Sequence, residues 1–73
     1  MLDKEYGDLL TELGNRIRSV RLSKRITQSH LSFTCDMEKS SISKIESGKV
    51  NVSYMTLLRL SNGLEVPVVE LCC

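Results

Sequence analysis

The chain has little of what β-rich, secreted or membrane-spanning proteins need. Its 73 residues include no tryptophan, one phenylalanine, two tyrosines and one proline. A β-sandwich would require more aromatic and β-branched side chains, so this composition favours an all-α fold. The sequence shows no secretory signal pattern and no apolar run of about 18 residues, which a membrane-spanning helix needs. We therefore predict one cytoplasmic domain over residues 1–73, with its core at about residues 6–71 and no contact with a membrane.

Cysteine and histidine are too few to suggest a disulfide framework or a metal site. There are three cysteines, an odd number, at Cys35, Cys72 and Cys73, and the sole histidine is His30. The adjacent pair at the end has two alternative roles, metal binding or crosslinking, but without a CxxC motif a frayed terminus is the preferred interpretation. His30 on a short helix is more often a surface or packing residue than a general base, and no nucleophile accompanies it. We predict no metal, no cofactor and no enzymatic activity.

Charged residues are segregated along the chain, although the formal net charge is only +1. Phosphate attraction acts over about 8 Å at physiological salt, so a local basic surface matters more than the total charge. The alternative is that these residues form ordinary solvated helix faces. The early acidic residues are Asp3, Glu5, Asp8 and Glu12, a basic run follows at Arg16, Arg18, Arg21, Lys24 and Arg25, and the later lysines are Lys39, Lys44 and Lys49.

Apolar spacing predicts a helix at the start of the chain and two more near its end. The first spans about residues 6–22 and the second residues 54–62, with Ser53 as its N-cap and Gly63 at its end. Pro67 opens a last short helical turn, because its missing N–H costs nothing at a first helical position. The supporting apolar residues are Leu9, Leu10, Leu13, Ile17 and Val20, then Leu57, Leu58 and Leu60, and finally Val68 and Leu71.

The central segment, ITQSHLSFTCDMEKSSISKIESGK at residues 26–49, predicts two short helices joined by a tight turn. Thr27 caps the first helix, and the second spans residues 39–47 and stops at Gly48, a usual left-handed terminator. Such a pair is a helix-turn-helix. The second helix would be roughly 13 Å long, which suits a DNA major groove about 12 Å wide. The buried positions are Leu31 and Cys35 in the first helix, and Ile42 and Ile45 in the second.

Four sequence blocks, taken in order, are similar to a known family. They are LGNRIRSVR at residues 13–21, ITQSHLS at 26–32, SSISKIESGK at 40–49, and MTLLRLSNGLEV with VVEL between residues 55 and 71. At this spacing the chain resembles the Cro and phage-repressor type of helix-turn-helix regulators found in bacteria and their phages. The resemblance implies a five-helix, lambda-repressor-like domain that binds a specific double-stranded DNA sequence and regulates transcription.

The resemblance also implies roles for individual residues. The second motif helix would read base edges, and flanking residues would bind phosphates, with helix N–H groups at Thr27 assisting. Thr27 has the alternative role of a simple cap, and either lysine of the reading helix has the alternative of reaching only phosphate. Arg21 and Glu46 would form an interhelical ion pair. The base-reading set is Lys39, Ser40, Ser43 and Lys44, and the phosphate-binding set is Arg16, Arg21, Thr27, Gln28, Ser47 and Lys49, to which charge adds Arg18 and Lys24.

The chain departs from the family pattern at four positions. Asp36 and Arg25 stand where glycine is common, and Ser32 replaces a frequent alanine. Glu38 stands where a serine or threonine cap is usual, and its negative charge would lie near DNA phosphates. Glu38 therefore favours the alternative function, a protein-interaction module or antitoxin-like partner that retains the fold without specific DNA readout.

A homodimer on a palindromic operator is the expected assembly, because one short helix covers only a few base pairs. The C-terminal part is the expected contact surface. We predict that Leu64, Val66 and Leu71 close the core. This leaves Val69, with Tyr54 or Met55, as the exposed apolar patch.

Overall fold

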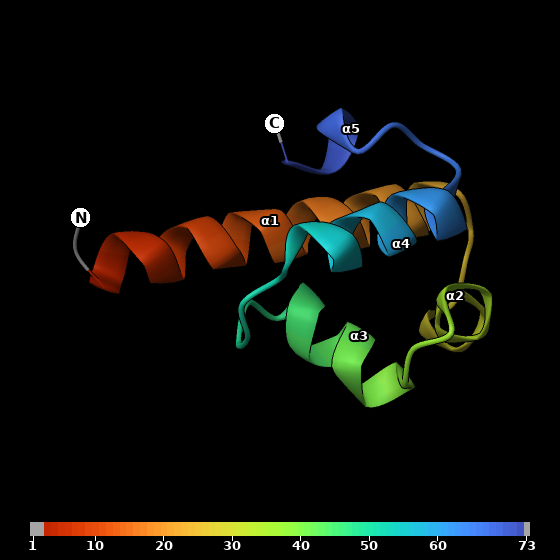
Figure 1. Ribbon diagram of the computed structural model, residues 1–73, viewed down its shortest axis with the longest axis horizontal. Helices are drawn as coiled ribbons and strands as arrows, with labels where there is room; N and C mark the ends of the chain where they lie inside the picture. Colours follow the sequence, from red (N-terminus) through yellow and green to blue (C-terminus); the bar gives the residue numbers. More distant parts are fainter. Residues whose placement is uncertain (1–2, 73) are drawn as a thin grey trace.

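The computed structural model describes residues 3–72, with the side chains of residues 7–71. Five helices follow one another: α1 (Asp3–Ser23), α2 (Gln28–Cys35), α3 (Lys39–Glu46), α4 (Tyr54–Leu64) and α5 (Val69–Cys72). The predicted all-α fold with five helices is confirmed. In Figure 1, α2 and α3 lie on one side of the long α1 and α5 lies on the other. The predictions about Cys72 and Cys73 concern side chains outside the described part.

Helix ends in α1, α3, α4 and α5 differ from the predicted ones. α5 begins at Val69, so Pro67, predicted at the first helical position, precedes the helix by two residues. α1 begins at Asp3 and not at Tyr6, because residues 3–5 are polar and apolar spacing cannot detect such a turn. α1 also extends to Ser23, one residue beyond the predicted end. α3 ends at Glu46, and Ser47 is its C-cap. Shifts of one or two residues at helix ends are usual, because the last turn frays.

The predicted end of α4 at Gly63 is wrong. α4 continues to Leu64, and its left-handed C-cap is Glu65, with φ of 59°. Gly63 is needed for a different reason, since a Cβ there would lie 2.5 Å from Cys35 Sγ and 3.0 Å from Leu31 Cδ1. The missing side chain lets α4 pack directly against α2.

The core takes at least one side chain from every helix. Leu9 was expected among these residues but is 53% exposed. Leu58 is only half-buried, and Ser61 takes its place in the buried stripe of α4, donating a hydrogen bond to the Leu58 carbonyl. The buried core consists of Ile17, Leu31, Cys35, Ile42, Ile45, Leu57, Leu60, Leu64 and Leu71.

Three turn residues adopt the left-handed conformation that their positions suggested. Asp36 and Arg25, which stand where the family commonly has glycine, have φ of 55° and 59°. Gly48 has φ of 75° and ends α3 as predicted. Asp tolerates this region better than most residues, whereas Arg has no such advantage.

Close contact between α1 and α3 depends on Gly14. A Cβ at this position would lie 2.5 Å from the Ile45 carbonyl oxygen and 2.6 Å from the Glu46 carbonyl oxygen. These are backbone atoms, which cannot turn away as a side chain can. Gly14 therefore sets how near the last turn of α3 lies to α1, and so helps to determine the position of α3.

Candidate nucleic-acid interface

α3 presents one buried and one exposed face. In Figure 1 its carboxyl-terminal end lies closest to α1, and its amino-terminal end is the lowest part of the fold in that view. Ile42, Ile45 and Glu46 are buried. All four predicted base-reading residues are exposed along the same short helix: Lys39, Ser40, Ser43 and Lys44.

The turn between α2 and α3 is held by backbone hydrogen bonds. The Asp36 N–H donates to the Phe33 carbonyl at 3.3 Å, and the Met37 N–H donates to the Ser32 carbonyl at 2.9 Å. At the other end of α2, the Thr27 hydroxyl oxygen accepts a hydrogen bond from the His30 N–H at 3.0 Å. Thr27 is thus a helix cap, as predicted, and its phosphate contact remains a prediction.

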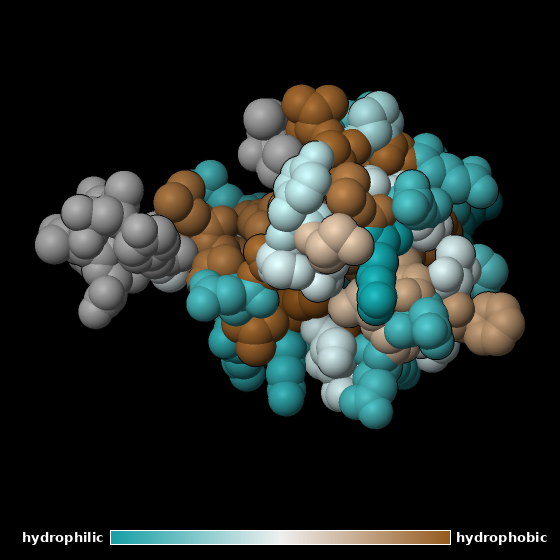
Figure 2. Space-filling model, in the orientation of Figure 1, coloured by the Kyte–Doolittle hydropathy of each residue, from teal (hydrophilic) through white to brown (hydrophobic). Residues whose placement is uncertain are grey.

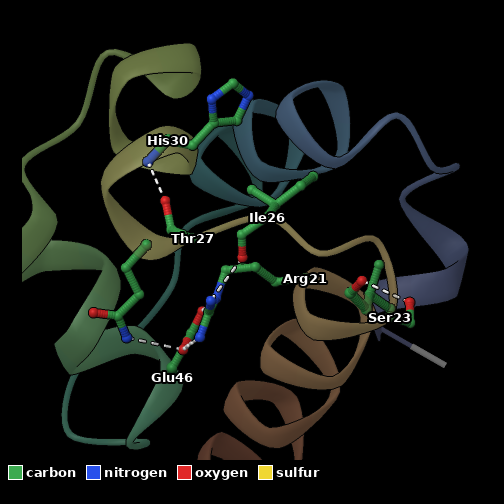
Figure 3. A network of polar contacts seen from close by, with 8 residues as sticks. Arg21, Ser23, Ile26, Thr27, His30 and Glu46 are labelled. Carbon is green, nitrogen blue, oxygen red and sulfur yellow. Dashed lines mark hydrogen bonds and ion pairs between the residues drawn. The ribbon is translucent and has the colours of Figure 1, made fainter.

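A buried polar network joins α3 to α1 and α2 (Figure 3). Arg21 donates from Nε to Glu46 Oε2 at 2.7 Å and from Nη2 to Glu46 Oε1 at 3.1 Å. Its third nitrogen, Nη1, donates to the Ile26 carbonyl at 2.8 Å. Gln28 Nε2 also donates to Glu46 Oε1, at 3.1 Å. The predicted ion pair is confirmed, and Gln28 extends it to the first residue of α2.

This network changes the roles predicted for two phosphate-binding residues. Arg21 is only 7% exposed and each of its three nitrogens already donates to a protein oxygen. These bonds use three of its five N–H hydrogens, so a phosphate could reach only the small exposed part of the guanidinium, and the phosphate contact of Arg21 stays a prediction. Gln28 is half-buried with its amide nitrogen turned to Glu46, which leaves one N–H hydrogen for a phosphate.

Arg16 does not lie with the other predicted site residues. It lines a shallow groove with Leu9, Leu13 and Leu71, between α1 and α5. α5 and α3 lie on opposite sides of α1 (Figure 1). Arg16 follows Gly14 by two residues, or about 200° around the helix, so it faces away from the side that contacts α3. Its predicted phosphate contact on the α3 surface is not supported.

Arg25 is a candidate that the sequence prediction did not include in the phosphate-binding set. A hollow of about 440 Å³ lies between the end of α1, the start of α2 and the start of α3. Arg25, Thr27, Gln28 and Lys39 are among its lining residues. Three cationic residues, Arg21, Arg25 and Lys39, and the N–H groups at the start of α2 thus line one hollow beside the reading helix. The sequence signals for this position were its place in the basic run and its departure from glycine.

Ser47 and Lys49 lie exposed directly after α3. The Ser47 hydroxyl donates to the Lys44 carbonyl at 3.1 Å, and the Lys49 N–H donates to the same oxygen at 3.0 Å. These bonds hold the segment against the end of α3, so the Lys49 side chain continues the basic side of that helix.

Cys35 is the one buried free cysteine of the described part. Burial raises the pKa of the Cys35 thiol above its ordinary value, although a backbone hydrogen bond at Gly63 and the charge of Arg59 act in the opposite direction. Cys35 Sγ donates to the Arg59 carbonyl at 3.2 Å, so the thiol serves as a packing group. Within residues 3–72 there is no cluster of three or more His, Cys, Asp or Glu side chains suited to a metal ion. Over the same range, no helix has the length and apolar character needed to cross a membrane.

Comparison with known proteins places this geometry in a family. The sequence profile described as helix-turn-helix matches residues 17–71. The chain belongs to the helix-turn-helix family. The resemblance to regulators of the Cro and phage-repressor type is therefore confirmed, and the motif of this family member is α2, the turn at residues 36–38, and α3.

The helix-turn-helix relatives include control proteins of restriction-modification systems. Control protein C.BamHI of Bacillus amyloliquefaciens is 41% identical over 54 residues, which cover 73% of this chain and 67% of that protein. The restriction-modification controller protein C.AhdI of Aeromonas hydrophila has a crystal structure with a TM-score of 0.83 and 32% identity, covering 85% of this chain and 94% of that one. The controller protein C.Esp1396I has been solved as a tetramer with its natural 35 base-pair operator; there the TM-score is 0.80 and the identity 33%, with 85% and 83% covered.

Proposed function

We propose that this protein is a transcriptional regulator of the restriction-modification controller type, which binds a specific double-stranded operator with α3. The observation that carries this proposal is the exposed face of α3, with Lys39, Ser40, Ser43 and Lys44, on a helix fixed by the buried Arg21–Glu46 pair. Lysine donates to guanine O6 and N7, and serine accepts or donates to several bases. A rigidly held helix with such side chains can discriminate between sequences, because its donors keep fixed positions in the groove.

Phosphate contacts would come from residues around this helix. We assign Arg25, Thr27, Gln28, Ser47 and Lys49 to this role, since they are exposed or half-buried around the two ends of α3 and the start of α2. Compared with the set that the resemblance implies, Arg16 and Arg21 are left out and Arg25 is added. Arg18 and Lys24, which charge added to that set, are exposed, and their phosphate contacts stay predictions.

The protein would act as a homodimer on a two-fold symmetric operator. One α3 of eight residues covers only a few base pairs, which gives too little discrimination against a genome of competing sites. Val69, Tyr54 and Met55 are 54%, 63% and 66% exposed, as expected for residues with a possible contact role. Figure 2 shows hydrophobic surface gathered over α5 and the adjoining part of α1, whereas the lower edge near α3 is mostly hydrophilic. The apolar α5 side is thus the better candidate for protein contact, and the polar side for DNA.

Selection of duplexes from a random pool, followed by binding at several salt concentrations, tests the proposal. The protein should enrich one palindromic motif, and genomic fragments that it retains should lie upstream of restriction-modification genes. If the four exposed cations Arg18, Lys24, Arg25 and Lys49 each neutralise one phosphate, each protomer gives a slope of about −3.6 in log K against log salt, and a dimer doubles it. A flat salt response without enrichment would favour a protein-interaction module, the alternative suggested by Glu38.

A further inference from the structure

The amino-terminal end of α3 carries two opposite charges side by side. Glu38 is the N-cap residue and Lys39 is the first residue of the helix. Both are exposed, and this end of α3 lies farther from α1 than the carboxyl-terminal end (Figure 1). In a helix-turn-helix, this is the end whose residues contact base edges.

Glu38 does not perform the usual task of its position. Its backbone has the extended conformation of an N-cap, with φ of −74° and ψ of 145°, but its side chain makes no capping hydrogen bond. The caps of α2 and α4, Thr27 and Ser53, both accept such bonds, at 3.0 Å and 3.1 Å. Glutamate is longer than the favoured capping residues serine, threonine, aspartate and asparagine, and its carboxylate makes no bond to the start of α3. Among residues 7–71 the Glu38 side chain has neither a hydrogen bond nor an ion pair.

A carboxylate at a DNA surface is unfavourable unless a base offers it a donor. In the major groove the donors are the amino groups at cytosine N4 and adenine N6. Adenine presents the N7 acceptor beside its N6 donor, and this acceptor would face the second oxygen of the carboxylate, which is unfavourable. Cytosine presents only the donor, so a carboxylate fits cytosine better than adenine. The G·C pair places this cytosine donor next to guanine O6 and N7, which are the acceptors that a lysine reads. An acidic side chain next to a basic one can therefore contact one G·C pair, with the carboxylate at the cytosine and the lysine at the guanine.

We propose that Glu38 is a specificity-determining residue that accepts a hydrogen bond from N4 of an operator cytosine, beside the guanine contacted by Lys39. This inference rests on the proposed function and adds to it a base preference at one position of each half-site. The negative charge of Glu38 would then weaken binding to most DNA sequences but weaken it least where a cytosine stands at this position.

The test is selection from randomised duplexes at one fixed salt concentration, with the parent, Glu38→Ala, Glu38→Gln and the control Asp36→Asn. The control removes the same charge two residues away, and asparagine tolerates the left-handed backbone of that position. The parent should prefer cytosine at one position per half-site by at least about fivefold, the low end for a base contact. Glu38→Ala should abolish that preference, and Glu38→Gln should move it toward adenine, because glutamine binds adenine N6 and N7 together. Asp36→Asn should raise affinity for all sequences and leave the cytosine preference intact.

The outcomes separate this inference from the function on which it rests. If both Glu38 variants retain the cytosine preference of the parent, with or without a uniform rise in affinity, Glu38 is only a repulsive charge and the inference is wrong. If the parent itself enriches no sequence, the proposed function fails. Circular dichroism of both Glu38 variants should match the parent, since the Glu38 side chain makes no hydrogen bond and its backbone bonds to Ser41 and Ile42 are kept.

Discussion

Removing one member of the Arg21–Glu46 pair should destabilise the fold about as much as removing both. The two side chains are 8% and 4% exposed, so either partner left alone is a charge largely hidden from water. Loss of one partner of a buried pair costs about 3–5 kcal/mol. A chain of 73 residues has a total stability of roughly 4–11 kcal/mol, so each single alanine variant should lose a large part of it.

The remaining hydrogen bonds set the size of the effect. In Glu46→Ala, Arg21 keeps only the Ile26 carbonyl as a partner, and in Arg21→Ala, Glu46 keeps only the amide of Gln28. Each orphaned charge is therefore partly compensated, which places the cost near 3 kcal/mol, the lower end of the range. At 4–8 °C per kcal/mol, each single variant should lower the Tm by about 12 °C or more.

Urea denaturation of the parent, both single variants and the double variant measures the coupling. The double alanine variant should cost less than the sum of the singles by about 2–3 kcal/mol, because no buried charge remains. Arg21→Met combined with Glu46→Leu should be close to the parent in stability, since well-packed apolar residues often replace a buried pair without loss. Glu12→Ala, on the exposed surface of α1, is the control and should change stability by less than about 0.5 kcal/mol. Additive losses would refute the reasoning.

Further predictions concern packing, pH, recognition and assembly. Gly63→Ala should destabilise by about 1–3 kcal/mol through its clash with Cys35 Sγ, and Cys35→Ala in the same chain should restore part of the loss in a denaturation cycle. Because burial raises the pKa of the folded Cys35 thiol, its contribution to stability is present below its ordinary pKa of 9.0 and is lost as pH rises above it; denaturation from pH 8 to pH 10 should therefore show a steeper decline in the parent than in Cys35→Ala. Lys44→Ala should relax specificity at one or two base pairs by about 1–3 kcal/mol, whereas Lys49→Ala should weaken all duplexes alike, and an unchanged site preference in Lys44→Ala would contradict the base-reading assignment. Sedimentation should show a dimer for the parent and a monomer for Val69→Glu; a parent that stays monomeric on a palindromic operator would exclude the dimer.

Local features of the sequence predicted most of the helices and turns. The spacing of Ile42 and Ile45, the cap at Thr27 and the terminator at Gly48 each act within one turn of the helix that they define. Such signals depend on neighbouring residues only, so they can be read before the chain is folded. The Arg21–Glu46 pair, between residues 25 apart, came from the family resemblance and not from local pattern.

The composition of the site was predictable from the sequence, but its arrangement was not. The sequence by itself determined the five helices, the helix-turn-helix and the exposed lysines on α3, because periodicity and capping decide these locally. Only the tertiary structure decided that Arg16 faces the α5 side, that Gln28 bonds to Glu46, and that Gly63 lies inside a helix against Cys35. The physical reason is that these facts depend on which faces of separate helices meet. The packing of the whole core decides which helix faces meet, so no single segment of the sequence is enough to predict it.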